Sequence, residues 1–206
     1  MPRKSFKILG NKPLAHWIVD TLLSIDRPDV DLDIWINTDS EEVAQLYVGK
    51  DVRIYMRPKE VQGDDVSMNT VLADWMEHIA AEPYDFYIQT HITNPFLSKE
   101  SILRAIDMYL KYGVGYSIMG VTRHQCRMWY KAKPVNFMPG AVIPTQDLKP
   151  LYEDNSCIYI FSDYVFKAWG RASCPPKMLE IPWPENIDID TEEEWNMARL
   201  VANEFI

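Results

Sequence analysis

The chain of 206 residues is long enough for one domain with a sizeable hydrophobic core. Its composition, 47% hydrophobic and 25% charged, excludes disordered, collagen-like and disulfide-scaffold proteins. The excess of 30 acidic over 21 basic residues gives a net charge of −9, which argues against nucleic-acid binding through a basic surface. No apolar run is long enough for a membrane span. Cys126, Cys157 and Cys174 have no C-x-x-C spacing, so we expect free thiols in a reducing, cytoplasmic compartment.

The first two thirds of the chain alternate between helical and extended patterns. In chain order, the patterns predict a helix from Leu14, a strand over 33–37, a helix capped by Ser40, a strand over 52–56, a helix from Met68, a strand over 85–92, a helix around 102–109 and a strand over 114–122. Regular patterns return near the C-terminus. They predict a strand over 157–161, a short helix over 164–169, a strand over 178–181 and a last helix opened by the capping box of Thr191 and Glu194.

Residues 123–155 have no sustained period and contain four prolines, at positions 134, 139, 144 and 150. This stretch predicts an irregular excursion or a protruding arm. The alternation of strands and helices elsewhere predicts an α/β fold with a mostly parallel sheet covered on both faces, because parallel neighbours need a crossover connection. Ligands of such sheets bind at the carboxyl ends of the strands, so the candidate site lies at residues 38–40, 57–67, 91–95 and 185–190.

Two aspartates near the C-terminus are the first candidates for metal binding. Asp188 and Asp190 alternate with Ile187 and Ile189 in the sequence NIDIDT. In an extended chain, both carboxylates leave one face while the isoleucines bury on the other. Two carboxylates suit Mg²⁺, which binds one or two of them together with substrate phosphates and waters. The competing interpretation is a solvated strand end with Asp190 near a helix N-terminus.

Two segments supply candidate contacts for a nucleotide. Arg57 and Ser67 lie in the loop after a predicted strand and suit a polar heterocycle or a phosphate, although an ordinary surface loop also fits this composition. Lys4 belongs to a short basic segment that also holds Arg3 and Lys7. Such a segment can face phosphates, although a solvated charged surface is the more common role.

His91 stands at the end of a predicted strand, at the ligand edge of the sheet. A lone histidine is usually structural, and the four histidines show neither a zinc-binding spacing nor a partner for nucleophilic catalysis. Asn155 and Tyr159 flank another strand and can present an amide and a phenol to a ligand, whereas Tyr159 alone reads as core.

Six segments carry a resemblance that no single motif supplies. They are, in order, PRKSFKILGNKPLAHW, NTDSEEVA, RPKEVQGDDVS, THITNPFL, TQDLKPLYEDNSCIYIF and NIDIDTEEEW. Together they resemble the acylneuraminate cytidylyltransferase family, which includes CMP-sialic acid synthetases and relatives acting on other nine-carbon acid sugars. The resemblance implies a three-layer nucleotide-diphospho-sugar transferase fold for residues 1–206 as one domain. It also implies a homodimer joined by an exchanged arm, here 123–155, and an Mg²⁺-dependent reaction of CTP with an acid sugar that releases pyrophosphate.

The resemblance assigns roles to residues that match the family's motifs. It implies that Lys4 contacts phosphate in the family's P-x-K-N segment, that Arg57 and Ser67 line the cytosine pocket, that His91, Gln146, Asn155 and Tyr159 line the sugar site, and that Asp188 and Asp190 bind Mg²⁺. Three positions depart from the family. Ser5 replaces the usual Asn, His91 replaces a sugar-contacting Gln, and Pro144 replaces an Arg of the arm.

Members of that family have a strand and a Gly-rich loop before the P-x-K-N segment, whereas this chain starts at that segment. The loop embraces the triphosphate, and the strand is central in the family's sheet. A gap at the centre of the sheet would leave backbone groups unpaired, at a cost of about 1 to 3 kcal/mol each if they are buried. We therefore expect either that the chain is a truncated reading of a longer protein or that another segment fills that place. Two alternatives to a cytidylyltransferase for an acid sugar stay open. One is a non-catalytic sugar- or nucleotide-binding relative, and the other is a nucleotidyltransferase for another base or sugar.

Overall fold

The computed structural model describes residues 3–63, 65–80, 84–141 and 143–204. The α-helices are α1 (Leu14–Leu23), α2 (Glu41–Gln45), α3 (Met68–His78), α4 (Lys99–Tyr112), α5 (Asp163–Trp169) and α6 (Glu192–Ala202). The strands are β1 (Ile8–Leu9), β2 (Lys12–Pro13), β3 (Trp35–Thr38), β4 (Arg53–Met56), β5 (Tyr87–Thr90), β6 (Ile118–His124), β7 (Trp129–Tyr130), β8 (Lys133–Pro134), β9 (Leu151–Phe161) and β10 (Lys177–Glu180). Short 3₁₀ turns are η1 (Lys4–Phe6), η2 (Lys59–Val61) and η3 (Thr145–Asp147). Each predicted helix and strand has a counterpart, and no described helix is long and apolar enough to cross a bilayer.

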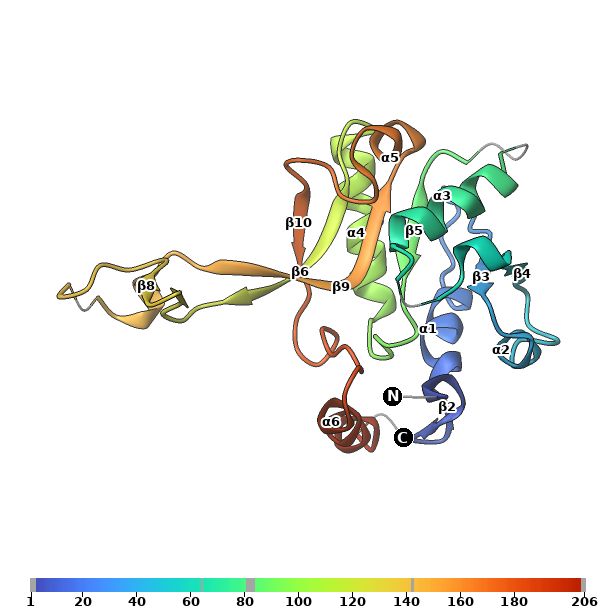
Figure 1. Ribbon diagram of the computed structural model, residues 1–206, viewed down its shortest axis with the longest axis horizontal. Helices are drawn as coiled ribbons and strands as arrows, with labels where there is room; N and C mark the ends of the chain where they lie inside the picture. Colours follow the sequence, from blue (N-terminus) through green and yellow to red (C-terminus); the bar gives the residue numbers. More distant parts are fainter. Residues whose placement is uncertain (1–2, 64, 81–83, 142, 205–206) are drawn as a thin grey trace.

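The α/β prediction is confirmed, but the predicted strands of the body form two separate sheets instead of one, and β1 and β2 pair in a further small sheet near the N-terminus (Figure 1). Four strands pair in the order β10-β6-β9-β5, and β3 pairs with β4. Because β9 is antiparallel to both β5 and β6, and β10 is parallel to β6, only β9 runs against the other three strands of its sheet. Within the described residues β3 pairs only with β4 and β5 only with β9. In the described part of the chain, β3 and β5 therefore belong to separate sheets.

Side-chain caps begin five of the six α-helices. In each case a hydroxyl oxygen accepts a hydrogen bond from a backbone N–H of the first turn, and the capping residues are Ser40, Ser67, Ser98, Ser162 and Thr191. The predicted capping box of Thr191 and Glu194 is present, with both reciprocal hydrogen bonds formed. These caps satisfy N–H groups that have no partner within the helix.

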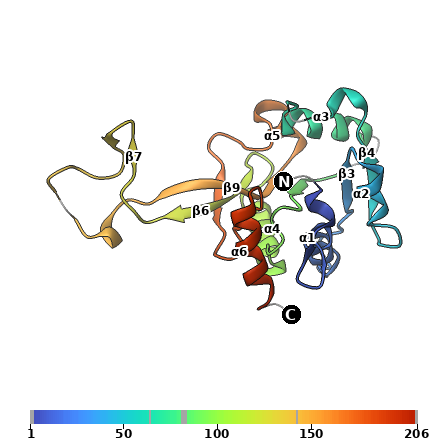
Figure 2. The same ribbon diagram turned by 60° about the horizontal axis from the view of Figure 1, so that its bottom comes forward.

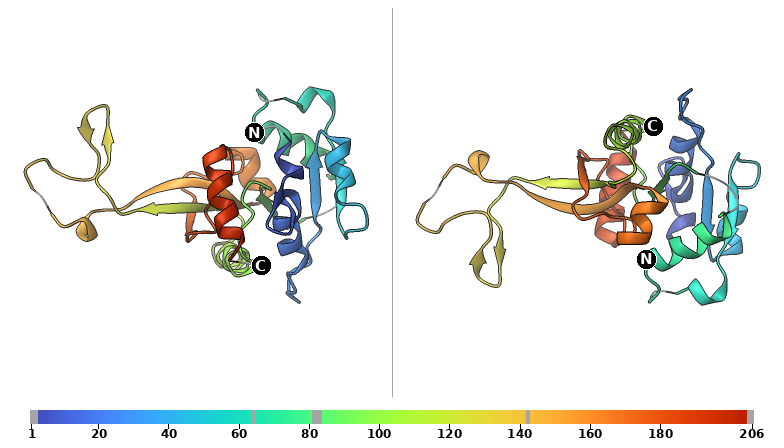
Figure 3. Two further views of the ribbon diagram at one scale, coloured as in Figure 1. Left: turned by 90° about the horizontal axis from the view of Figure 1, so that it is seen from below. Right: turned by 90° about the horizontal axis from the view of Figure 1, so that it is seen from above.

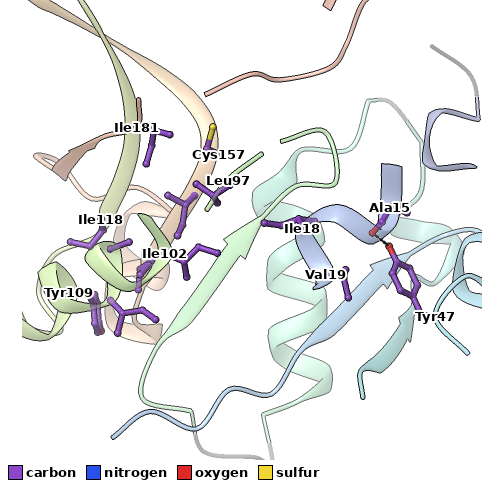
Figure 4. Close-up of a cluster of buried hydrophobic side chains, with 14 residues drawn as sticks. Ala15, Ile18, Val19, Tyr47, Leu97, Ile102, Tyr109, Ile118, Cys157 and Ile181 are labelled. Carbon is purple, nitrogen blue, oxygen red and sulfur yellow. Dashed lines mark hydrogen bonds between the residues drawn. The ribbon is translucent and has the colours of Figure 1, made fainter. Parts of the chain in front are cut away.

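The largest apolar cluster joins the two sheets. It runs from α4 and β6 on one side to α1 and Tyr47 on the other, where the Tyr47 hydroxyl donates to the carbonyl of Ala15 (Figure 4). Ile36 of β3 and Ile88 of β5 both pack against this cluster. A second cluster packs α6 against the N-terminal segment through Leu9 and Trp195. The apolar cluster around α1 thus holds the two sheets together, although among the described residues no strand of one sheet pairs with a strand of the other.

The segment 123–155 extends away from the body in every view (Figures 2 and 3). Its irregular character was predicted too broadly, because β6 continues to His124 and β9 begins at Leu151, and the two strands pair along the base of the arm. The strands were missed there because both faces of the base are open to solvent, so the sequence shows no apolar alternation. Beyond the base, β7 and β8 form a small hairpin.

Candidate functional site

Residues from opposite ends of the chain meet at the acidic pair. The Lys4 Nζ atom donates to Asp190 Oδ1 at 2.8 Å and to the carbonyl oxygen of Ile189 at 3.1 Å. The side chain of Ile189 is fully buried and that of Ile187 nearly so, whereas Asp190 is exposed and Asp188 is half-buried. The predicted alternation of NIDIDT is therefore confirmed. It places two carboxylates and one ammonium group at one edge of the body.

Asp188 has the features expected of a cation ligand. Its Oδ1 atom is buried and has no hydrogen-bond partner among the described residues. Burial raises the pKa of this carboxyl, the charge of Asp190 raises it further, and a hydrogen bond from Thr93 opposes both effects. A buried carboxylate oxygen without a partner, beside a second carboxylate, fits a hard divalent cation. Within the described residues no third acidic, His or Cys side chain completes a metal site, so the remaining ligands would be substrate oxygens and waters.

A chain of polar contacts leads from His91 to β9. The Gln89 side-chain nitrogen lies 3.1 Å from His91 Nε2, and the Gln89 oxygen accepts from the Arg171 guanidinium at 3.2 Å. The Arg171 Cζ atom lies 4.1 Å from the centroid of the Tyr159 ring, and the Tyr159 hydroxyl donates to Asp154. Gln89 and Tyr159 are paired across β5 and β9. The strand register thus gathers these side chains at the carboxyl end of β5.

Burial, and the positive charges of Arg171 and Lys4, lower the pKa of His91 to about 4, while the charges of Asp190 and Asp154 oppose this shift. His91 is therefore neutral at pH 7. An ordinary His pKa of 6.5 in the unfolded chain means that the unfolded state binds more protons as the pH falls. The stability linked to His91 is complete above pH 6.5 and is lost as the pH falls toward 4.

We expect the wild type to lose about 1 to 3 kcal/mol more unfolding free energy than His91→Gln between pH 7 and pH 4. Urea unfolding of both proteins across this range measures the difference. His124→Gln is the matched control, because its ring lies in the exposed arm base beside Glu153. Parallel pH curves for the wild type and His91→Gln would contradict the assignment.

Asn155 and Asp188 line one cleft of about 350 Å³ between β6, β9 and the segment before α6. The side-chain nitrogens of Asn155 and Asn186 both donate to the Thr122 hydroxyl, at 3.2 and 3.1 Å. The Asn186 Oδ1 atom is buried and has no hydrogen-bond partner among the described residues. Two residues that line the cleft, Asn186 and Asp188, thus each hold a buried oxygen without a hydrogen-bond partner among the described residues.

The two predicted nucleotide contacts lie apart from the acidic pair. Arg57 follows β4 and donates to the side-chain and backbone oxygens of Asn37 at 2.6 and 3.1 Å, so it is fixed to the end of β3. The Ser67 hydroxyl caps α3 by accepting from the Thr70 N–H. A second cavity, of about 430 Å³, lies between η1 and the start of α2, and Lys4 lines it. Lys4 thus stands between the acidic pair and the end of the β3–β4 sheet.

Gln146 is the predicted sugar contact that is not brought near the others. It lies in η3 on the exposed arm, where its backbone carbonyl accepts from the Gln125 side chain at 3.3 Å. No described contact joins it to His91 or Asn155.

Sequence reasoning missed several side chains at this edge: Gln89, Thr122, Asp154 and Arg171. Gln89 carried a usable signal, since it is a polar residue near the carboxyl end of a predicted strand. Asp154 and Arg171 carried none, because their place depends on the antiparallel pairing of β9 and on the turn after α5.

A family model described as cytidylyltransferase matches residues 1–162. N-acylneuraminate cytidylyltransferase A of Danio rerio is 23% identical over 207 residues, which cover 96% of this chain and 46% of that protein. N-acylneuraminate cytidylyltransferase of Streptococcus agalactiae serotype III is 25% identical over 167 residues, which cover 78% of this chain and 40% of that protein. The chain thus spans about half the length, or less, of these two relatives.

Two solved structures share the fold. CMP:2-keto-3-deoxy-manno-octonic acid synthetase complexed with CTP superposes with a TM-score of 0.69 at 14% identity, over 100% of this chain and 94% of that one. The 4-diphosphocytidyl-2C-methyl-D-erythritol synthase of Anaerococcus prevotii gives a TM-score of 0.65 at 15% identity, over 95% of this chain and 88% of that one. These likenesses confirm the fold class predicted from the sequence.

Proposed function

Because the chain belongs to the cytidylyltransferase family, we propose that it transfers the cytidylyl group of CTP to an acid sugar of the sialic-acid type and releases pyrophosphate. The observation that carries the proposal is the contact of Lys4 with Asp190, beside the unpartnered oxygen of Asp188. Such a group suits a triphosphate accompanied by a metal ion, because one or two carboxylates can hold the metal and an ammonium group can contact phosphate oxygens. Relatives named N-acylneuraminate cytidylyltransferase support the choice of an acid sugar.

The proposed chemistry is a direct displacement without a covalent enzyme intermediate. The sugar hydroxyl oxygen forms a bond to the α-phosphorus, and the bond from the α-phosphorus to the bridging oxygen of pyrophosphate breaks. The hydroxyl proton passes to solvent. Asp188 and Asp190 would hold Mg²⁺, which when bound neutralises charge on the phosphate oxygens. Lys4 adds a second positive charge, and the protein's main contribution is to position the reactants.

The sugar would occupy the edge lined by His91, Asn155 and Tyr159, beside the acidic pair. Arg57 and Ser67 would contact the base from the β3–β4 side, with Lys4 between the two regions.

We also propose a homodimer formed through the arm. Several large apolar side chains of the arm are exposed: Trp129, Tyr130, Val135 and Met138. A second copy covering them would remove this apolar surface from water and could bring Gln146 to a sugar site. Sedimentation of the wild type and of Trp129→Ser with Met138→Ser tests this part, and an unchanged monomer mass in both would contradict it.

The function is tested by incubating the protein with Mg²⁺, each of four nucleoside triphosphates and either an N-acylneuraminate or a neutral hexose, while pyrophosphate is measured. We expect pyrophosphate only with CTP and the acid sugar. Release with another nucleotide would indicate a different nucleotidyltransferase. Calorimetric binding of CTP without any release would favour the non-catalytic relative.

A further inference from the structure

Arg171 has hydrogen-bonding capacity that the protein itself does not use. A guanidinium group carries five N–H donors in a rigid planar fork. One guanidinium nitrogen donates to Gln89, and the plane of positive charge lies against the Tyr159 ring. Among the described residues no carboxylate forms an ion pair with Arg171, although this is an acidic chain with a net charge of −9.

Arg171 also sets the orientation of its neighbours. Because a guanidinium group has no acceptor, the Gln89 atom that faces Arg171 must be the amide oxygen. The Gln89 amide nitrogen then faces His91 Nε2, which accepts the hydrogen bond, so the proton of the neutral ring lies on Nδ1. Arg171 thus fixes the amide of Gln89 and, through it, the tautomer of His91.

The group lies next to the proposed reaction centre. His91 accepts from Gln89 and lies two residues before Thr93, whose backbone carbonyl accepts from the N–H of Ile189 at 2.9 Å. Ile189 lies between the two aspartates of the acidic pair. Arg171, His91 and Gln89 therefore form one wall, with donors from two side chains, beside the place where the sugar would react. Arg171 is partly buried, so its remaining N–H donors can reach water in the free protein. An apolar substituent placed against them is disfavoured, because the donors would lose water and gain no acceptor.

We propose that Arg171 is a specificity-determining residue that donates to an oxygen acceptor of the acid sugar, an inference that rests on the proposed function. The acceptor is a carboxylate or hydroxyl oxygen shared by all acid sugars, or the carbonyl oxygen of an acyl substituent. An acid sugar that places an apolar group against Arg171 is disfavoured as a substrate.

The test compares Arg171→Met, which keeps the length and apolar packing over Tyr159, with Arg171→Lys and the wild type. Steady-state kinetics are measured with an N-acylneuraminate and with 2-keto-3-deoxy-manno-octonic acid. Loss of a charge-assisted hydrogen bond predicts that Arg171→Met raises KM for the sugar about 10- to 100-fold and leaves KM for CTP unchanged. The KM of Arg171→Lys for the sugar should lie between those of the wild type and Arg171→Met, because lysine keeps the positive charge but lacks the planar set of N–H donors. An increase only with the N-acylneuraminate identifies the acyl carbonyl, and an increase with both identifies a shared oxygen.

Arg199→Met is the matched control, because Arg199 is exposed on α6 and the same substitution there should leave both KM values unchanged. Thermal unfolding checks that Arg171→Met is folded. Equal sugar KM values in Arg171→Met and the wild type would overturn the inference, as would equal increases for sugar and CTP. If the wild type shows no turnover, the proposed function fails, and calorimetry with the N-acylneuraminate alone decides the inference. Weaker binding to Arg171→Met than to the wild type supports it, and equal or no binding to both overturns it.

Discussion

Asp190→Asn is expected to lower the rate of pyrophosphate release at least about 100-fold at saturating CTP and sugar, because it removes a negative charge that would hold the metal ion against the phosphates. Asp188→Asn should have an effect of similar size. Both amides keep the shape of the side chain, so the loss reports charge and not packing. Pyrophosphate release measured over a series of Mg²⁺ concentrations separates weaker metal binding from slower chemistry.

The two variants should remain folded, and for different reasons. The ion pair of Asp190 with Lys4 is 2.8 Å long but 69% of the Asp190 side chain is exposed, so its removal costs less than about 1 kcal/mol. At Asp188, burial and the neighbouring Asp190 raise the carboxyl pKa, which means that the fold disfavours the charged form. A neutral amide there is expected to leave the unfolding free energy unchanged or slightly higher.

Asp163→Asn is the control for both, since Asp163 forms an exposed ion pair with Lys167 in the first turn of α5. It should keep the wild-type rate. Near-wild-type CMP-sugar formation by Asp190→Asn would refute the metal assignment, and an equal loss in Asp163→Asn would point to a general electrostatic effect.

Local patterns predicted the acidic pair, because the alternation of Asp and Ile within four residues is decided by neighbours in sequence. The capping box of Thr191 was predictable for the same reason. The contact of Lys4 with Asp190 was not, since it joins residues separated by 186 positions and depends on how the N-terminal segment packs against α6. Only the resemblance to a family brought those two residues together before the fold was known.

The division of the strands into separate sheets could not be predicted from local sequence patterns. Each strand was predicted from its own residues, but pairing depends on which edges are available. The direction of β9 also follows from the arm, because a strand that returns after an excursion can pair antiparallel with the strand that left. Gln89 and His91 lie two residues apart in the sequence, so their nearness could be predicted from spacing. The place of Arg171 beside them could not, because it depends on the pairing of β9 and on the turn after α5.

Ile189→Ala is expected to lower the unfolding free energy by about 2 to 5 kcal/mol, because it leaves a cavity in a cluster that packs α6 against the N-terminal segment. The side chain of Ile189 is 0% exposed, its N–H donates to Thr93 at 2.9 Å and its carbonyl accepts from Lys4. Equilibrium denaturation in urea measures the change, which should shift the midpoint with little change in slope.

Ile189→Val is the matched control and should cost only about 0.5 to 1.5 kcal/mol, since it removes one methylene from the same place. The residue also connects stability to function, because its backbone lies between the two aspartates and beside Lys4. A cavity at this point lets the extended segment shift, so Ile189→Ala should need more Mg²⁺ for half-maximal pyrophosphate release even where it is fully folded. Equal losses of stability in the two variants would contradict the cavity argument. An unchanged Mg²⁺ requirement in Ile189→Ala would mean that this cluster does not hold the acidic pair in place.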